Sequence, residues 1–328
     1  CNNSTAMPAT IALRYVRCLP LAALILAASA SAAFPEKPVR MIVASAPGGG
    51  TDIIARYVAQ GLGEQWREQT VVDNRAGGGG AVATELVARA APDGYTLLVQ
   101  SFGISSIGAL RRGMPVDVKR DLAAVALLAT QPSLVAVHAA LPAANIAELV
   151  QLAKSRTLQY GTSGAGGASH LASELLARAA GVRFTAVQYK GIGPAFTALL
   201  GGEIQIALVP VSTALPQLGS GRIRALAVTG AARSPLAPDI PTVREAGVPG
   251  YAFDAWYGLF APAAIAPALA DAINAAVNRT LAAPALRARM AGAGIEPLGG
   301  PRTQFAQYFA AEVAKWSTLV TEAGIRAD

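Results

Sequence analysis

Glycine-rich segments carry the pattern in this sequence that most suggests chemistry. The first turn spans residues 47–52, the second 74–80 and the third 163–170. Each follows an apolar run that predicts a strand and precedes a helical period. Glycine lets a ligand approach the backbone closely, and the free N–H groups and dipole at a helix start favour an anion. Three such turns predict an anion-binding cleft; the alternative is that they only connect strands to helices.

A nucleotide-binding signature is incomplete in the second turn. Residues 78–83 match the pattern G-x-G-x-x-A, but they follow the second predicted strand rather than the first. The next strand ends at Gln100 and Ser101, without an acid placed to bind a ribose. No Gly-Lys pair is followed by Ser or Thr, so there is no P-loop. A nucleotide site is therefore not expected.

A nucleophile signature is incomplete in the third turn. Residues 161–165 differ by one residue from G-x-S-x-G, with Ser163 as the serine. His170 lies on the helix that Ser163 precedes, which is poor geometry for a general base, and His138 has no identifiable acidic partner. A hydrolase using Ser163 is accordingly a third hypothesis. His170 either bonds locally in the first turn of its helix or donates from the rim of a pocket.

The N-terminal residues predict export. Arg14 and Arg17 precede an apolar stretch at 19–28, and an Ala-x-Ala ending at Ala32 follows it. This order is typical of a secretory signal peptide, and the stretch is too short to span a bilayer, which needs about 20 residues. We expect residues 1–33 to be a signal peptide, cleaved after Ala32 or Ala33, and the mature protein to be periplasmic.

Cysteine content and charge restrict the chemistry further. Cys1 and Cys18 both lie in the predicted signal peptide, so we expect neither a disulfide nor thiol chemistry in the mature protein. Two histidines without a carboxylate cluster predict no metal site, and we expect no cofactor. The net charge of +7 falls by two with Arg14 and Arg17. In the absence of a Lys/Arg run, this mild excess argues against nucleic acid and favours an anionic ligand.

Strand and helix patterns alternate along the rest of the chain, which predicts doubly wound α/β layers. Several of the strands are apolar throughout, as expected for parallel strands buried on both faces. Residues 145–148 resemble a capping box, and Gly181 stands where a helix C-cap is expected. The predicted strands are residues 39–45, 70–73, 96–100, 134–138, 158–161, 185–189, 204–210 and 223–229.

Two places are candidate crossings between lobes. One is Gln131-Pro132, between two apolar runs, and the other is the aromatic segment 251–262. A chain that crosses twice has a discontinuous first lobe. We therefore expect residues 34–131 plus 255–328 in the first lobe and residues 132–254 in the second.

Taken in order, these motifs resemble the Bug-type substrate-binding proteins of tripartite tricarboxylate transporters, over residues 34–326. Each motif is weak alone, whereas their order and spacing together are specific. The motifs are residues 34–40, 48–52, 72–75, 91–98, 163–171, 189–191, 224–229, 241–247 and 256–262.

The resemblance implies an α/β fold of the two-lobed, type II periplasmic-binding-protein class, with a mixed sheet flanked by helices in each lobe and the ligand cleft between the lobes. It implies a small carboxylate ligand: a di- or tricarboxylate, an acidic amino acid or an aromatic acid. Carried over to this sequence, it implies the following ligand-binding residues: Ala46, Gly48, Gly49, Gly50, Thr51, Asp52, Ser101, Ser163, Gly166, Ser169, His170, Tyr189, Lys190, Gly191 and Asp254.

The sequence departs from the family where the ligand is concerned. Ala44 and Ser45 stand where the family usually has proline and an aromatic residue, which predicts a wider or more polar pocket. Gln205 replaces a common acid and either alters charge selectivity or faces away. Lys190 is either a second anchor or solvated, and Trp256 either stacks on a ligand or packs at the hinge.

The predicted function is that of a monomeric solute-binding protein rather than an enzyme. It captures a small carboxylate and delivers it to the membrane permease subunits of a tripartite tricarboxylate transporter. A second hypothesis is a periplasmic sensor that presents the carboxylate to a signalling receptor. The sequence leaves both open, because both use the same closed lobes.

Overall fold

The strands of the protein fall into two sheets. The computed structural model describes residues 1–2, 34–111, 113–189 and 191–325. Residues 37–328 form one compact unit, to which all the elements named below belong. Apart from Cys1 and Asn2, the predicted signal peptide lies outside the described residues.

The first sheet has six strands in the order β11-β4-β10-β3-β1-β2. β1 pairs in parallel with β2 and β3, and β10 pairs antiparallel with β3 and β4. Its strands are β1 (Val39–Val43), β2 (Thr70–Asn74), β3 (Thr96–Ser101), β4 (Leu122–Gln131), β10 (Ala255–Pro262) and β11 (Glu296–Pro297). The helices with it are α1 (Gly50–Trp66), α2 (Ala81–Ala88), α3 (Ile107–Leu110), α8 (Pro267–Ala282), α9 (Pro284–Gly292) and α10 (Arg302–Glu322).

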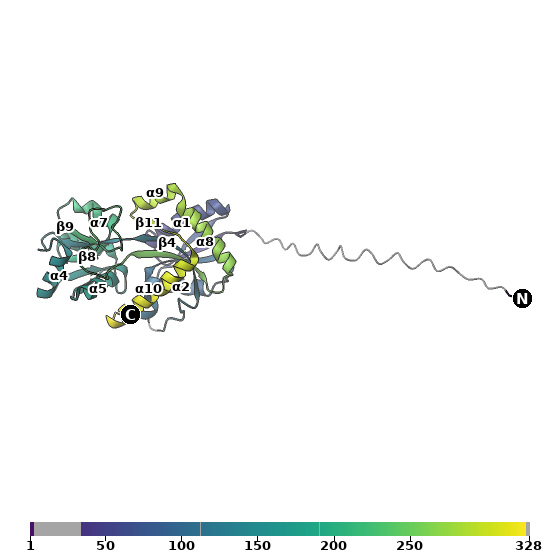
Figure 1. The fold of residues 1–328 in the computed structure, drawn as a ribbon, viewed down its shortest axis with the longest axis horizontal. Helices are drawn as coiled ribbons and strands as arrows, with labels where there is room; N and C mark the ends of the chain where they lie inside the picture. The colour runs from purple at the N-terminus through teal and green to yellow at the C-terminus, as the bar shows by residue number, and fades with distance from the viewer. Residues whose placement is uncertain (3–33, 112, 190, 326–328) are drawn as a thin grey trace. The chain divides into compact units, whose positions relative to one another are not determined.

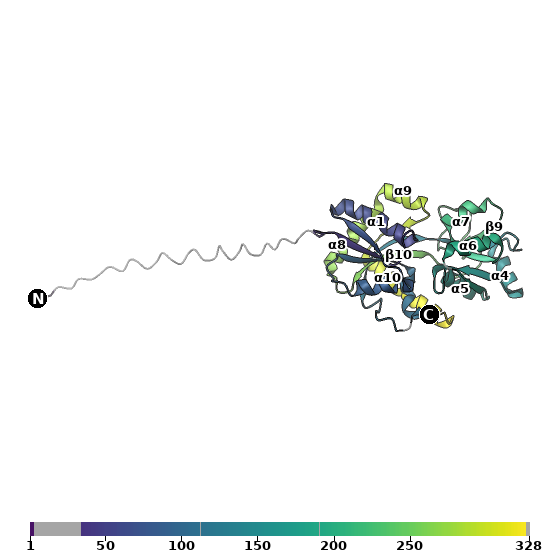
Figure 2. The same ribbon diagram turned by 180° about the vertical axis from the view of Figure 1, so that it is seen from behind.

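The second sheet has five strands in the order β7-β6-β8-β5-β9. Its strands are β5 (Ser133–His138), β6 (Gln159–Thr162), β7 (Thr185–Gln188), β8 (Ile206–Pro210) and β9 (Ile223–Val228). Its helices are α4 (Ile146–Ser155), α5 (Ala168–Ala180), α6 (Ile192–Gly201) and α7 (Val211–Leu218). Figures 1 and 2 show α4, α5 and α7 gathered around this sheet, and α1, α8 and α10 around the first.

Both sheets are mixed and flanked by helices, as predicted. The expectation that uniformly apolar strands are parallel is wrong for β5. β5 is almost entirely buried, yet it pairs antiparallel with both β8 and β9. Its alternate residues pack into two different core clusters, Val135 and Val137 into one and Leu134 and Ala136 into the other, so burial on both faces, rather than strand direction, explains its apolar sequence.

The chain passes between the sheets at two neighbouring places. β4 ends at Gln131 and β5 begins two residues later, at Ser133. The return segment leads to Ala255 of β10, which pairs with Gln131. Near the same point, Thr229 donates its backbone N–H to Ser133 and accepts one from Phe253. The two crossings are therefore paired directly through Gln131 and Ala255. They are also hydrogen-bonded to the same residue, Thr229.

An aromatic core supports these crossings. Trp256 is fully buried and lies edge-on to Phe305, Tyr308 and Phe309. Its indole N–H donates to the Glu312 carboxylate at 3.0 Å. Trp256 thus packs beside the crossing and does not face solvent.

Local signals in the sequence are confirmed at two helix ends. The side chain of Asn145 accepts the backbone N–H of Glu148 at 2.9 Å, which caps α4 as predicted. Gly181 ends α5 in the left-handed conformation, with φ of +65°, as a helix C-cap requires.

Candidate ligand-binding site

The first turn leaves β1 at the carboxyl edge of the six-stranded sheet and leads into α1. Gly48 is left-handed with φ of +80°, a conformation that costs other residues about 1–2 kcal/mol. Gly49 is the N-cap, and the helix starts at Gly50. Six of the predicted ligand-binding residues lie on this stretch of backbone: Ala46, Gly48, Gly49, Gly50, Thr51 and Asp52.

Asp52 holds the first turn in shape. Its side chain is buried, and its carboxylate accepts the backbone N–H of Gly48 at 2.8 Å, the amide of Asn74 at 2.9 Å and the guanidinium of Arg56 at 3.0 Å. Burial raises the pKa of Asp52, but hydrogen bonds from Arg56, Gly48 and Asn74 outweigh it and leave the pKa below its usual value. The ionised carboxylate is therefore committed to neighbouring protein groups.

The third turn leaves β6 in the five-stranded sheet and leads into α5. Gly166 is left-handed with φ of +71°, and Gly167 is the N-cap of the helix that starts at Ala168. The hydroxyl of Ser169 accepts the backbone N–H of Ser163 at 2.7 Å and donates to the Ser163 hydroxyl at 3.1 Å. These bonds close the turn on itself.

His170 also bonds to the third turn. It is buried, and its Nδ1 accepts the backbone N–H of Gly166 at 2.9 Å. Burial lowers the pKa of His170, and the nearby carboxylate of Glu174 opposes the shift only in part. The imidazole is therefore neutral at pH 7, and because Nδ1 accepts, its proton is on Nε2.

The second turn lies beside the first and packs against β3. The Asn74 amide reaches back to the backbone oxygen of Ser45 at 3.0 Å. Gln100 is buried, and within the described residues its Nε2 has no hydrogen-bond partner. That amide lies so close to Gly80 that any side chain there would collide with it. Glycine at position 80 is thus required by close packing.

Three residues that the sequence patterns did not indicate lie against the turns. Tyr257 donates its hydroxyl to Gln131 at 3.0 Å, and a Cβ added at Gly50 would be 2.6 Å from that hydroxyl. Because side chains alternate along a strand, the fully buried Trp256 would have indicated that Tyr257 points to the other face. Leu110 and Arg111 come from α3 and the residue after it.

Leu110 and Arg111 touch two different turns. A Cβ at Gly166 would be 2.5 Å from Leu110 Cδ1, and a Cβ at Gly78 would be 3.4 Å from Arg111 Cζ. The end of α3 thus lies against two turns. One is the second turn, which belongs to the six-stranded sheet, and the other is the third turn, which belongs to the five-stranded sheet. No local pattern in a four-residue helix predicts this.

The predicted rim residues lie at other strand ends. Ser101 ends β3 and pairs with Tyr257. Tyr189 follows β7 and donates its backbone N–H to Thr162 at 3.1 Å, beside the third turn. Gly191 is the N-cap of α6, and Lys190 lies outside the described residues.

Asp254 lies at the second crossing, and no described contact joins it to a glycine turn. Its carboxylate lies against Gly230, where a Cβ would be 2.7 Å from Oδ1. Burial raises the pKa of Asp254 to about 6, and the backbone N–H of Ala231 opposes this. Asp254 is thus a candidate for the hinge rather than for the turns.

The residues that depart from the family have local roles. Ser45 bonds its hydroxyl to the backbone oxygen of Ala46 at 3.3 Å, and Ala44 packs on the core. Gln205 accepts the backbone N–H of Gln159 through its side chain at 2.9 Å. Of the two interpretations of Gln205, this bond favours a strand-end residue that faces away from the turns.

Ser163 has no histidine base among its described contacts. Its hydroxyl bonds to Ser169, while His170 Nδ1 is occupied by Gly166. His138 accepts the backbone N–H of Ala140 at 3.3 Å, at the end of a different strand. The geometry therefore gives no support to the Ser163 hydrolase hypothesis.

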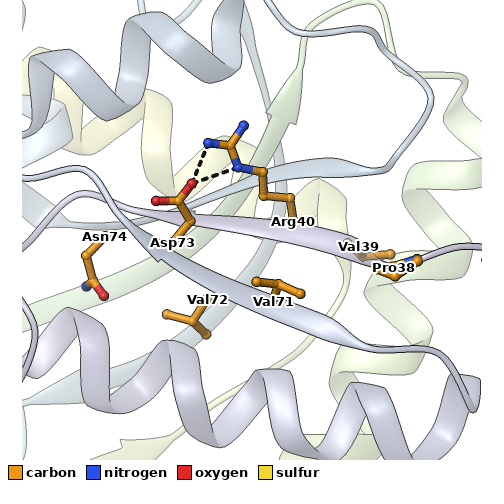
Figure 3. Close-up of a pocket in the computed structure, with 7 residues that line it drawn as sticks. All are labelled: Pro38, Val39, Arg40, Val71, Val72, Asp73 and Asn74. Atoms are coloured by element: carbon orange, nitrogen blue, oxygen red, sulfur yellow. Dashed lines mark hydrogen bonds and ion pairs between the residues drawn. The ribbon is translucent and has the colours of Figure 1, made fainter.

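A pocket of about 410 Å³ opens at the edge of the six-stranded sheet, lined by residues of β1 and β2. Figure 3 shows Arg40 of β1 and Asp73 of β2 next to each other, with the guanidinium against the carboxylate. Arg40 Nε donates to Asp73 at 2.8 Å, so the cation is already neutralised. This pocket is not an anion site of the predicted kind.

Within the residues that the structure describes, no helix is long and apolar enough to cross a membrane. Among the same residues, no group of three or more His, Cys, Asp or Glu side chains is arranged to hold a metal ion.

Most of the chain is similar to a known family and to known proteins. Residues 54–325 match the profile described as tripartite tricarboxylate transporter family receptor. BugT of Bordetella pertussis is 31% identical, with 89% of this chain and 91% of that protein covered. The family predicted from the sequence motifs is confirmed.

Solved structures agree with the family. A protein of R. palustris solved with adipate has a TM-score of 0.77 and 34% identity, covering 89% of this chain and 99% of that one. MatC of Rhodopseudomonas palustris, solved with malate, has a TM-score of 0.75 and 32% identity, covering 88% and 100%. Together with the mixed sheets, these similarities confirm the predicted fold class, that of periplasmic binding proteins.

Proposed function

We propose a function from the premise that this chain belongs to the tripartite tricarboxylate transporter family of receptors. It is a solute-binding protein that closes two lobes on a small carboxylate. The observation that carries the proposal is a pair of glycine turns that open helices on two different sheets, one after β1 and one after β6. A ligand held by both turns bridges the lobes and stabilises the closed state.

The hydrogen bonds within the turns indicate which N–H groups the ligand uses. Gly48 and Gly166 already donate to Asp52 and His170. Gly49 and Gly167 donate to the backbone oxygens of Ala46 and Gly164. The next N–H groups belong to the first helical residues, which have no partner inside a helix.

The carboxylate is therefore bound by the N–H groups of Gly50 and Thr51 from one lobe and of Ala168 and Ser169 from the other. Both helix dipoles place positive potential there. The hydroxyl of Ser163 lies beside these groups. Ser101, Tyr189, Lys190 and Gly191 form the rim, and Asp254 belongs to the hinge.

The lobes follow the sheets. The first comprises residues 34–131 and 255–328, and the second comprises residues 132–254. Closure turns one lobe against the other at the two crossings, next to Pro132 and just before Ala255. The aromatic packing of Trp256 keeps the first-lobe side of this hinge rigid.

The ligand class is supported by the solved relatives. One was solved with adipate and another with malate. Both are small acids with ionised carboxylates near neutral pH. We extend to this chain only their shared chemistry, a compact aliphatic acid.

The cellular setting follows from the family and the N-terminus. Residues 1–33 direct export to the periplasm and are removed. The mature protein works as a monomer, catalyses no reaction and presents its closed form to the membrane subunits of a tripartite tricarboxylate transporter.

Calorimetric titration of the mature protein tests the binding function. Adipate and malate are compared with adipamide, which replaces both carboxylates of adipate by neutral amides. We expect at least one acid to bind and the diamide not to bind. Absence of binding by every acid tested, or equal binding of the diamide, contradicts the proposal.

Replacing Ala168 by proline tests the site itself. Proline is tolerated at the first helical position and lacks an N–H, and the preceding Gly167 is extended, with φ of −70° and ψ of 170°, as a residue before proline should be. Ala168→Pro should weaken acid binding about tenfold through one lost charge-assisted hydrogen bond. Ala168→Gly, which keeps the N–H, is the matched control and should bind like the parent.

A further inference from the structure

The acceptor that holds the third turn is an imidazole. His170 stands four residues after Gly166 and accepts its N–H through Nδ1 at 2.9 Å. Asp52 stands in the same relation to Gly48, at 2.8 Å. A carboxylate accepts over almost the whole pH range, whereas an imidazole accepts only when it is neutral.

Protonation of His170 would reverse this hydrogen bond. Imidazolium carries an N–H on both ring nitrogens, so Nδ1–H would face the N–H of Gly166. Two donors then oppose each other in a buried place, and a buried donor without an acceptor is costly. The left-handed conformation of Gly166, and with it the start of α5, loses its support.

Burial opposes protonation of His170, and the charged groups around the ring act in both directions. Tyr160 of β6 stacks near the ring, with centroids 6.2 Å apart, and its hydroxyl donates to Glu174 of α5 at 2.5 Å. Glu174 favours the charged imidazole. The N-terminus of α5 disfavours it, and Arg111, which follows Leu110 where α3 packs on Gly166, is a charged residue at this end of α3.

We propose that His170 is a positioning residue that keeps the third turn in its ligand-binding shape only while the ring is neutral, so that acidification releases the ligand. This inference rests on the proposed function. It differs from a direct role in binding. A histidine that donates to the carboxylate would bind the ligand more tightly when protonated, whereas a histidine that accepts from Gly166 binds it more weakly when protonated. The sign of the pH dependence separates the two.

The test is calorimetric affinity for adipate between about pH 5.5 and pH 8, where histidine titrates, with His170→Asn as the comparison. The Oδ1 of asparagine accepts from a position close to that of Nδ1 and does not titrate. We expect the affinity of the parent protein to fall about tenfold per pH unit once the ring titrates, while that of the variant stays flat. Titration of adipate itself is common to both proteins and cancels in their ratio.

Two outcomes overturn the proposal. One is a ratio of parent affinity to His170→Asn affinity that does not change with pH, and the other is a ratio that rises as the pH falls. If neither protein binds any acid at pH 8 although both are folded, the proposed function itself fails.

A second measurement does not depend on the variant folding. Nitrogen NMR of the imidazole in the parent protein reports the tautomer directly. Near pH 8 we expect the proton on Nε2, with Nδ1 unprotonated. A proton on Nδ1 would exclude the bond to Gly166 and the proposal with it.

Discussion

The first and third turns share one backbone plan but differ in charge. In each, a left-handed glycine, Gly48 or Gly166, precedes an N-cap glycine. The N-cap residue donates to the backbone oxygen three residues before it, and the left-handed glycine donates to a side chain four residues after it. That side chain is an ionised aspartate in the first turn and a neutral histidine in the third.

The difference shows which parts of such a turn are constrained. The two glycines and an acceptor four residues after the first of them are common to both helix starts. The charge of the acceptor varies, and its surroundings vary with it. Asp52 is paired with Arg56 at 3.0 Å, whereas His170 has the carboxylate of Glu174 nearby, which favours the protonated ring.

The largest expected effect separates the two acceptors. Asp52→Ala leaves three donors without their partner, from Gly48, Asn74 and Arg56, and should lower the free energy of unfolding by about 3 kcal/mol or more. His170→Ala leaves one donor, the backbone N–H of Gly166, without its acceptor. It should lower the free energy of unfolding by about 1–2 kcal/mol. Urea unfolding of both variants measures the difference. Equal losses would show that the extra bonds of Asp52 contribute little.

The second effect comes from the two left-handed glycines. Alanine at either position meets a backbone strain of about 1–2 kcal/mol. At Gly48 the new Cβ has no neighbour within 4 Å, but at Gly166 it would be 2.5 Å from Leu110 Cδ1. Gly166→Ala should therefore cost about 1–3 kcal/mol more than Gly48→Ala.

Leu110→Ala removes the side chain that would clash with an alanine at position 166. Added to Gly166→Ala it should recover part of the extra cost, and added to Gly48→Ala it should recover none. Thermal unfolding of the double variants decides the point. Equal behaviour of the two pairs would contradict the contact between α3 and the third turn.

Acid should weaken the third turn before the first. The folded pKa of His170 lies below its ordinary value of 6.5, so the unfolded chain binds more protons and stability falls as pH drops through that value. The pKa of Asp52 is lowered from 3.8, so its contribution persists above 3.8 and is lost only at lower pH. Melting temperatures at pH 7, 5.5 and 4.5 for the parent and His170→Asn should diverge between about pH 6.5 and pH 5. A difference that is constant with pH would mean that His170 is not buried neutral.

The smallest effect concerns Arg56. It is half exposed, and exposed ion pairs contribute about 0.2–1 kcal/mol. Arg56→Gln should therefore cost about this much, and somewhat more than Arg89→Gln, which breaks a pair with Glu85 on α2 in which neither side chain is buried, whereas Asp52 is buried. A loss far above that of Arg89→Gln would make Arg56 a structural part of the first turn.

Much of this architecture is predictable from sequence, and the remainder depends on distant contacts. Strand ends followed by glycines indicate the turns, because few other residues allow a left-handed residue before a helix. The acceptor role of Asp52 is not visible in the sequence, since it depends on how the turn folds back, and for His170 the sequence left a local bond and a donor role at the rim both open. Leu110 and Tyr257 reach the turns only through tertiary packing. The direction of β5 follows from the crossing at Pro132 rather than from its composition.

The most direct test of binding by both turns is amide hydrogen exchange of the mature protein with and without a saturating acid, adipate or malate. We predict slower exchange on binding in two separate segments, residues 48–52 and 166–170, because one carboxylate accepts N–H groups from both helix starts. Saturable binding with protection in only one segment, or in neither, would contradict a ligand held between the two lobes.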